Sequence, residues 1–152
     1  VKREHPIMKR LILSLAFFVC VAAAATPALA QQSGGLRVEF QGPGGHSSGA
    51  YGRVSALHAA ARAVILIQRA LPSGSYQITN LTGGNSVNSI ASDGLIELKL
   101  TAPNAAAYQA LVTAVTKAAA EGAAAENAFR NVKPGDLTSG APATVRSSVT
   151  AP

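Results

Sequence analysis

Apolar and polar residues alternate along three short stretches of the chain, and each stretch predicts a half-buried β-strand. These stretches are residues 36–40, 76–81 and 94–101. The third is the clearest, because apolar residues occupy every second position, at 96, 98 and 100. Each pattern therefore predicts a strand with one face on a core and one polar face in solvent.

Two longer stretches carry apolar residues at helical spacing. The first begins after Ser55, a suitable N-cap, and ends at Pro72. The second begins after Asn104, another N-cap residue, and covers residues 105–127. Gly122 lies within it and is expected to mark its end or a kink, because Gly costs about 1 kcal/mol relative to Ala in a helix.

The order β-α-β-β-α predicts an α+β fold, a two-layer sandwich in which two helices cover one face of an antiparallel sheet of three to four strands. This is a ferredoxin-like arrangement, expected over residues 31–130. A closing strand is placed at 129–132 or 144–149. The rest of 131–152 is rich in Pro, Gly and Ser and is expected to be disordered. An open edge strand is expected to pair with a second copy.

Residues 1–30 have the pattern of an N-terminal extension and a secretory signal peptide. Met8-Lys9-Arg10 is a basic start, residues 11–24 are almost entirely apolar, and Ala28-Leu29-Ala30 is a small-residue cleavage site before Gln31. The apolar run is shorter than the ~20 residues of a membrane-spanning helix. We therefore expect export to the periplasm or the exterior, with no stable membrane span after cleavage.

The charge of the chain does not indicate nucleic-acid binding. Four of the 13 basic residues and one of the seven acidic residues precede residue 31, so the formal charge of +6 falls to +3 beyond it. The remaining basic residues are scattered and have no interleaved aromatic residues. The single Cys also lies in the first thirty residues, so no disulfide is expected in the remainder.

Two Gly-rich loops, residues 42–48 and 83–90, contain the candidate chemistry. His46 in the first loop and Asn88 in the second carry side chains that can donate hydrogen bonds to a ligand. Turn formation is the alternative explanation for both loops, and for Asn85 as well as Asn88. Ser47 and Ser48 beside His46 suggest a serine nucleophile with a histidine base, but no acid is evidently placed to orient the imidazole.

These loops, at this spacing and in this order of elements, resemble the dimerisation (lid) domain of the M20 metallopeptidases over residues 36–127. The matching motifs are Val38 to Ser47 and Thr82 to Ile90. The resemblance implies a homodimer in which His46 reaches into the partner's active site and helps to stabilise a tetrahedral intermediate. It also implies that Asn88, with Asn85 nearby, contacts the substrate.

Two departures from that family pattern bear on activity. Family enzymes bind two zinc ions on a separate domain, and this sequence has neither their His-x-Asp motif nor their adjacent Glu pair, so no cofactor is expected in this chain. The family's substrate-gripping Arg falls on Thr101, which cannot form a bidentate pair with a carboxylate.

The sequence therefore predicts a non-catalytic, exported dimerisation or protein-interaction domain. The alternative is a subunit or fragment that completes an M20-type amidohydrolase or peptidase in trans through His46, with a separate catalytic domain as its partner. A third reading is a small-ligand binding protein that uses the cleft between the two loops. A gene remnant without a selected role is the fourth.

Overall fold

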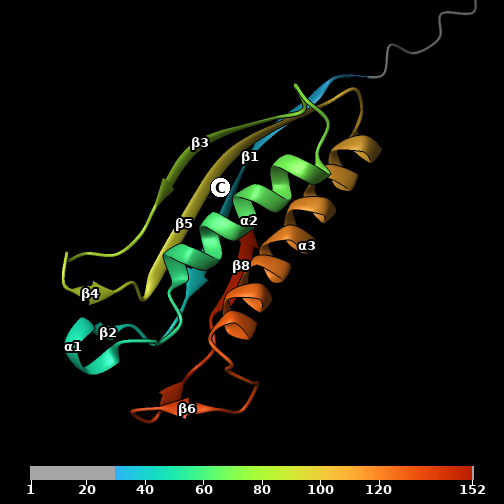
Figure 1. Ribbon diagram of the computed structural model, residues 1–152. Helices are drawn as coiled ribbons and strands as arrows, with labels where there is room; N and C mark the ends of the chain where they lie inside the picture. Colours follow the sequence, from blue (N-terminus) through green and yellow to red (C-terminus); the bar gives the residue numbers. More distant parts are fainter. Residues whose placement is uncertain (1–29, 152) are drawn as a thin grey trace, which may run out of the picture.

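The computed structural model describes residues 30–151, and its main feature is a four-stranded antiparallel sheet (Figure 1). The strands lie in the order β3-β5-β1-β8, with the bounds Tyr76–Thr82, Asp93–Ala102, Gln32–Gln41 and Arg146–Thr150. Two long helices, α2 (Ala56–Ala70) and α3 (Ala105–Phe129), pack on one face of the sheet. The predicted two-layer α+β sandwich is thus confirmed, with four strands.

The core lies between that face and the two helices. Along β1 the side chains of Leu36, Val38 and Phe40 are buried, whereas the intervening Arg37 and Glu39 are exposed. The open face is polar, and Arg37 Nε donates to Glu39 Oε1 at 2.7 Å. This hydrogen bond raises the pKa of Arg37 above its ordinary value. The alternation read from the sequence therefore assigns the two faces of the sheet correctly.

Helix α3 runs without interruption through Gly122, so the expected helix end at this glycine is wrong. Gly122 is buried where α3 crosses α2, and a Cβ added there would lie 2.8 Å from both the Ala59 carbonyl oxygen and the Ala63 Cβ. The glycine is therefore a point of close approach between the helices rather than a helix terminus.

The tail also departs from the expectation of disorder. Residues 146–150 form β8, which pairs antiparallel with β1, from Gln41↔Arg146 to Arg37↔Thr150. Val145 ahead of this strand is buried and is held by Asn127 of α3, whose Oδ1 accepts from Val145 N at 2.8 Å and whose Nδ2 donates to Val145 O at 3.0 Å. The closing strand therefore forms near the predicted 144–149, and residues 129–132 form no strand.

Five short elements gather at the end of the sheet remote from the start of β1 (Figure 1). Each has only two to four residues, too few for a periodic pattern in the sequence, and they are β2 (Gly45–His46), α1 (Ser47–Ala50), β4 (Ser89–Ile90), β6 (Leu137–Thr138) and β7 (Ala141–Pro142). We call this region the loop end of the domain.

The predicted signal peptide lies outside the described residues, apart from Ala30. Among the helices of residues 30–151, none combines the length and the apolar character that a membrane span requires.

Candidate functional site

The two Gly-rich loops, which are about forty residues apart in the sequence, form one unit at the loop end. Strand β2 pairs with β4 through Gly45↔Ile90 and His46↔Ser89. Ser47 N also donates to Asn88 O at 2.8 Å. Gly44 makes the turn into β2 with φ +61°, and a Cβ at this position would lie 2.7 Å from the Ser92 Cβ. Glycine is therefore required there for both its backbone conformation and its size.

The side chains of His46 and Asn88 are in direct contact. The Asn88 Nδ2 lies 3.1 Å from His46 Nε2, and both residues are exposed. On the other side of the ring, His46 Nδ1 lies 2.8 Å from Ser48 Oγ and 3.2 Å from Ser48 N, because His46 is the N-cap of α1. Ser86 Oγ donates to Asn88 Oδ1. The imidazole is thus held by hydrogen bonds at both nitrogens.

The tautomer of His46 decides what this pair can do. If Nδ1 accepts from the Ser48 N–H, the neutral ring carries its proton on Nε2, and the carboxamide oxygen of Asn88 must turn to face it. If Nδ1 is protonated, it donates to Ser48 Oγ and Nε2 accepts from Asn88. Of these two neutral tautomers, only the first has a hydrogen-bond donor at Nε2, and such a donor can stabilise an oxyanion that takes the place of the Asn88 oxygen.

Asn85 does not join this pair. Its Oδ1 is 3.5 Å from Ser89 Oγ, a long hydrogen bond, and its side chain is exposed on the neighbouring surface. The arrangement favours a role in the turn of the 83–90 loop.

Thr101, to which the resemblance assigns the position of a substrate-gripping Arg, lies at the opposite end of β5 from the loops. Asp93 pairs with Gln41 beside the first Gly-rich loop, whereas Thr101 pairs with Ser33. Eight residues of extended strand separate them, which is roughly 26 Å at about 3.3 Å per residue. In one copy of the chain, position 101 and the His46–Asn88 pair therefore cannot contact the same small ligand.

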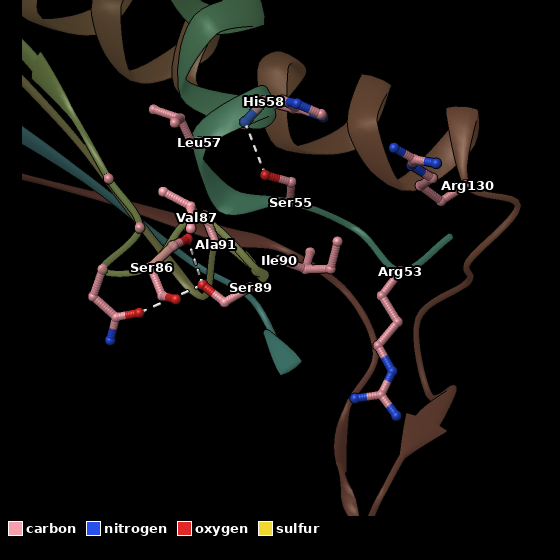
Figure 2. Close-up of a pocket in the computed structure, with 13 residues that line it drawn as sticks. Arg53, Ser55, Leu57, His58, Ser86, Val87, Ser89, Ile90, Ala91 and Arg130 are labelled. Carbon is pink, nitrogen blue, oxygen red and sulfur yellow. Dashed lines mark hydrogen bonds between the residues drawn. The ribbon is translucent and has the colours of Figure 1, made fainter. Parts of the chain in front are cut away.

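The groove beside the 83–91 loop contains residues that the sequence pattern did not single out. Arg53 and Arg130 lie on its wall with Ser55 and His58 from the start of α2 (Figure 2). Beneath them Glu126 is fully buried, and its Oε1 accepts from Ser55 N at 3.1 Å. One signal was available in the sequence: Glu126 follows buried positions 115, 118, 119, 122 and 123 at helical spacing, so it falls on the face of α3 that packs against α2.

The described residues do not fit the family's metal site. Within residues 30–151 there is no group of three or more His, Cys, Asp or Glu side chains placed to hold a metal ion.

The sheet, the two helices and the joined polar loops define the chain as a small two-layer α+β domain. The M20 peptidase dimerisation domain family matches residues 31–127. The chain belongs to this family.

Solved structures show the same fold. An aminobenzoyl-glutamate utilization protein from Klebsiella pneumoniae is 17% identical with a TM-score of 0.59, and the alignment covers 80% of this chain and 28% of that one. A tripeptidase from Staphylococcus aureus is 16% identical with a TM-score of 0.57, over 80% of this chain and 29% of that one. An amidase of the hydantoinase/carbamoylase family from Burkholderia ambifaria is 20% identical with a TM-score of 0.57, over 82% and 28%.

This chain thus spans less than a third of the length of these three proteins. No curated protein matches the sequence.

Proposed function

We propose that the chain is a non-catalytic homodimerisation module in which two copies pair along the outer edge of β3. The observation that carries this proposal is a partly exposed apolar row on that edge strand. In the described part of the chain, β3 pairs only with β5, so its other edge remains available to a second strand.

The apolar row consists of Tyr76, Ile78 and Leu81. Tyr76 is paired with Leu100 and Ile78 with Leu98, and both partners are buried beneath the helices. The register then shifts at Thr79, so that Leu81 is opposite the buried Ile96. This bulge keeps Leu81 on the helix-covered face, where simple alternation would turn it to the polar face. Leu81 is nevertheless 42% exposed.

Helix α2 extends this apolar surface. Leu57, Ala61 and Val64 recur at helical spacing and are only half-buried, and Ile65 beside them is 48% exposed. Strand pairing across a two-fold axis would bring a second copy of this surface against the first, because a two-fold interface uses the same patch on both subunits. In such a dimer the apolar row becomes buried, and the backbone of β3 forms hydrogen bonds with β3 of the second copy.

Size-exclusion chromatography with light scattering tests this proposal. The wild type is expected to be a dimer at micromolar concentration, and Leu81→Lys is expected to shift it to the monomer. Leu137→Lys is the matched control, because Leu137 is 70% exposed but lies on β6. A wild type that stays monomeric at high micromolar concentration would overturn the proposal, as would equal effects of the two substitutions.

A second candidate function is completion of an M20-type hydrolase in trans, and the position of His46 favours it. The His46–Asn88 pair is exposed at the loop end, far from Thr101, so it is suited to reach a site on another molecule. The test mixes the chain with a separately produced metal-binding domain and measures amide hydrolysis. His46→Ala should abolish any restored activity, whereas His58→Ala should not. Equal activity of the two variants would refute this role for His46.

Export is part of the proposed function and rests on the pattern of residues 1–30. Expression in a bacterial host followed by fractionation and N-terminal sequencing tests it. The expected product begins at Gln31 in the exported fraction. An intact N-terminus in the cytoplasm would contradict export.

A further inference from the structure

A groove of about 500 Å³ opens at the loop end, next to the joined loops (Figure 2). Residues 83–87 and 89–91 line one side, and the start of α2 with Arg53 and Arg130 lines the other. His46 and Asn88 are not among the lining residues. The groove therefore does not include the His46–Asn88 pair, and no residue of β3 lines it, although it shares Leu57 with the apolar surface beside β3.

The charge on the groove is positive. Arg53 and Arg130 line it, and no Asp or Glu of residues 30–151 does. Arg53 is held only by neutral groups: its Nη1 donates to Gly44 O at 3.1 Å and its Nη2 to Ser139 Oγ at 3.3 Å. Since no carboxylate of the described chain pairs with Arg53, its charge is uncompensated.

Arg130 is oriented but only partly neutralised. Its Nε donates to Glu126 Oε1 at 3.3 Å, and its guanidinium carbon lies 5.0 Å from the centre of the Phe129 ring. Glu126 also accepts from Ser55 N and from Arg62 Nε, so one buried carboxylate serves two arginines. The cluster therefore keeps a net positive charge, and the positive end of the α2 dipole adds to it.

Four apolar residues also line the groove, and we call them its apolar wall: the fully exposed Val87 with Ile90 and Ala91 on the loop side, and Leu57 on the α2 side. The polar residues Asn85, Ser86 and Ser89 lie on the loop side as well. We propose that this groove binds a small organic carboxylate that carries a short apolar chain. A guanidinium is suited to a carboxylate because its planar fork matches the two oxygens, and the apolar wall favours an organic ligand over an inorganic anion.

Titration of the full chain, followed by ¹H–¹⁵N NMR, tests the proposal with hexanoate as the probe. We expect saturable shifts in the amides of residues 55–58 and 83–91. Hexanamide has the same chain without the charge, and acetate has the charge without the chain. Both are expected to bind at least tenfold more weakly, as is inorganic phosphate. Equal binding of hexanamide, or shifts that map to another surface, would overturn the proposal.

Two substitutions test separately how the positive charge and the apolar wall contribute to hexanoate binding. Arg53→Gln should weaken hexanoate binding about tenfold, which corresponds to about 1.4 kcal/mol. Arg69→Gln is the matched control, since Arg69 is exposed in the last turn of α2, outside the groove, and it should bind as the wild type does. Wild-type affinity of Arg53→Gln would refute the proposal.

Val87→Ser changes no charge and does not alter the core, because Val87 is exposed. It therefore tests the proposal independently if Arg53→Gln disturbs the Gly44 turn. It should weaken hexanoate several-fold without changing the binding of acetate. Unchanged affinity for hexanoate would count against the apolar wall. The titration can be followed in a monomer or a dimer, so its outcome is distinguishable from failure of the proposed dimerisation.

Discussion

The buried carboxylate of Glu126 offers the sharpest test of how the loop end is held together. Its side chain is completely inaccessible, and it joins the start of α2, through Ser55 N at 3.1 Å, to the end of α3. Arg62 Nε donates to Oε2 at 3.1 Å and Arg130 Nε to Oε1 at 3.3 Å. We predict that Glu126→Ala lowers the free energy of unfolding substantially.

The magnitude follows from what the substitution leaves behind. Removing one partner of a buried ion pair costs about 3–5 kcal/mol. The Arg62 and Arg130 side chains are 36% and 26% exposed, so water can solvate them in part, which places the effect near the lower limit. The buried N–H of Ser55 would lose its acceptor, at about 1–3 kcal/mol. We therefore expect about 3 kcal/mol for Glu126→Ala and about 1–2 kcal/mol for Glu126→Gln, which keeps an acceptor for Ser55.

Urea unfolding followed by circular dichroism measures these differences in the free energy of unfolding. In thermal unfolding, the melting temperature of Glu126→Ala should be about 12 °C below that of the wild type, at roughly 4 °C per kcal/mol. Glu121→Gln is the matched control on the same helix. Its partner Lys117 is 2.9 Å away, but the two side chains are 49% and 75% exposed, so the loss should stay within about 0.5 kcal/mol. A change below 1 kcal/mol for Glu126→Ala, or equal losses at both positions, would refute the reasoning.

Two further predictions concern packing and the tail. Gly122→Ala should lower the free energy of unfolding by about 1–3 kcal/mol in urea unfolding, because the new Cβ would lie 2.8 Å from atoms of Ala59 and Ala63. This loss is expected although Ala is the better helix former. A variant more stable than the wild type would show that the two helices can move apart without loss of stability. Asn127→Ala should lower the free energy of unfolding by about 2 kcal/mol and accelerate amide hydrogen exchange in β8, because both hydrogen bonds to Val145 are lost. Unchanged exchange in β8 would show that its pairing with β1 is sufficient to hold the tail in place.

Much of the fold could be predicted from the sequence, because its signals are local. Ser55 and Asn104 cap α2 and α3 as expected, with their side chains accepting from His58 N and Ala107 N. The alternation in β1 and β5 identified the buried face, since neighbouring side chains on a strand point in opposite directions. The two Gly-rich loops were also recognised as a pair by their composition and spacing.

Two predictions from the sequence are wrong, one for Gly122 and one for the tail, and each error has a physical reason. Gly122 weakens a helix by its intrinsic propensity, but in the fold its lack of a side chain permits the close crossing with Ala59. The tail has few large apolar residues and therefore resembles a disordered segment. It is ordered in the structure because β1 offers a free edge and Asn127 holds Val145. Asn127 precedes Val145 by 18 residues and Gln41 of β1 precedes its partner Arg146 by 105 (146 − 41), so no local pattern reveals either contact.

The sequence by itself determined the helices, the long strands and the presence of two polar loops, because each depends on residues within a few positions of one another. Only the tertiary structure decided which groups meet. It placed His46 against Asn88, separated both from Thr101, buried Glu126 between two helices and left the apolar row of β3 partly exposed. These outcomes depend on strand order, register and helix packing, which bring together residues that no local pattern connects.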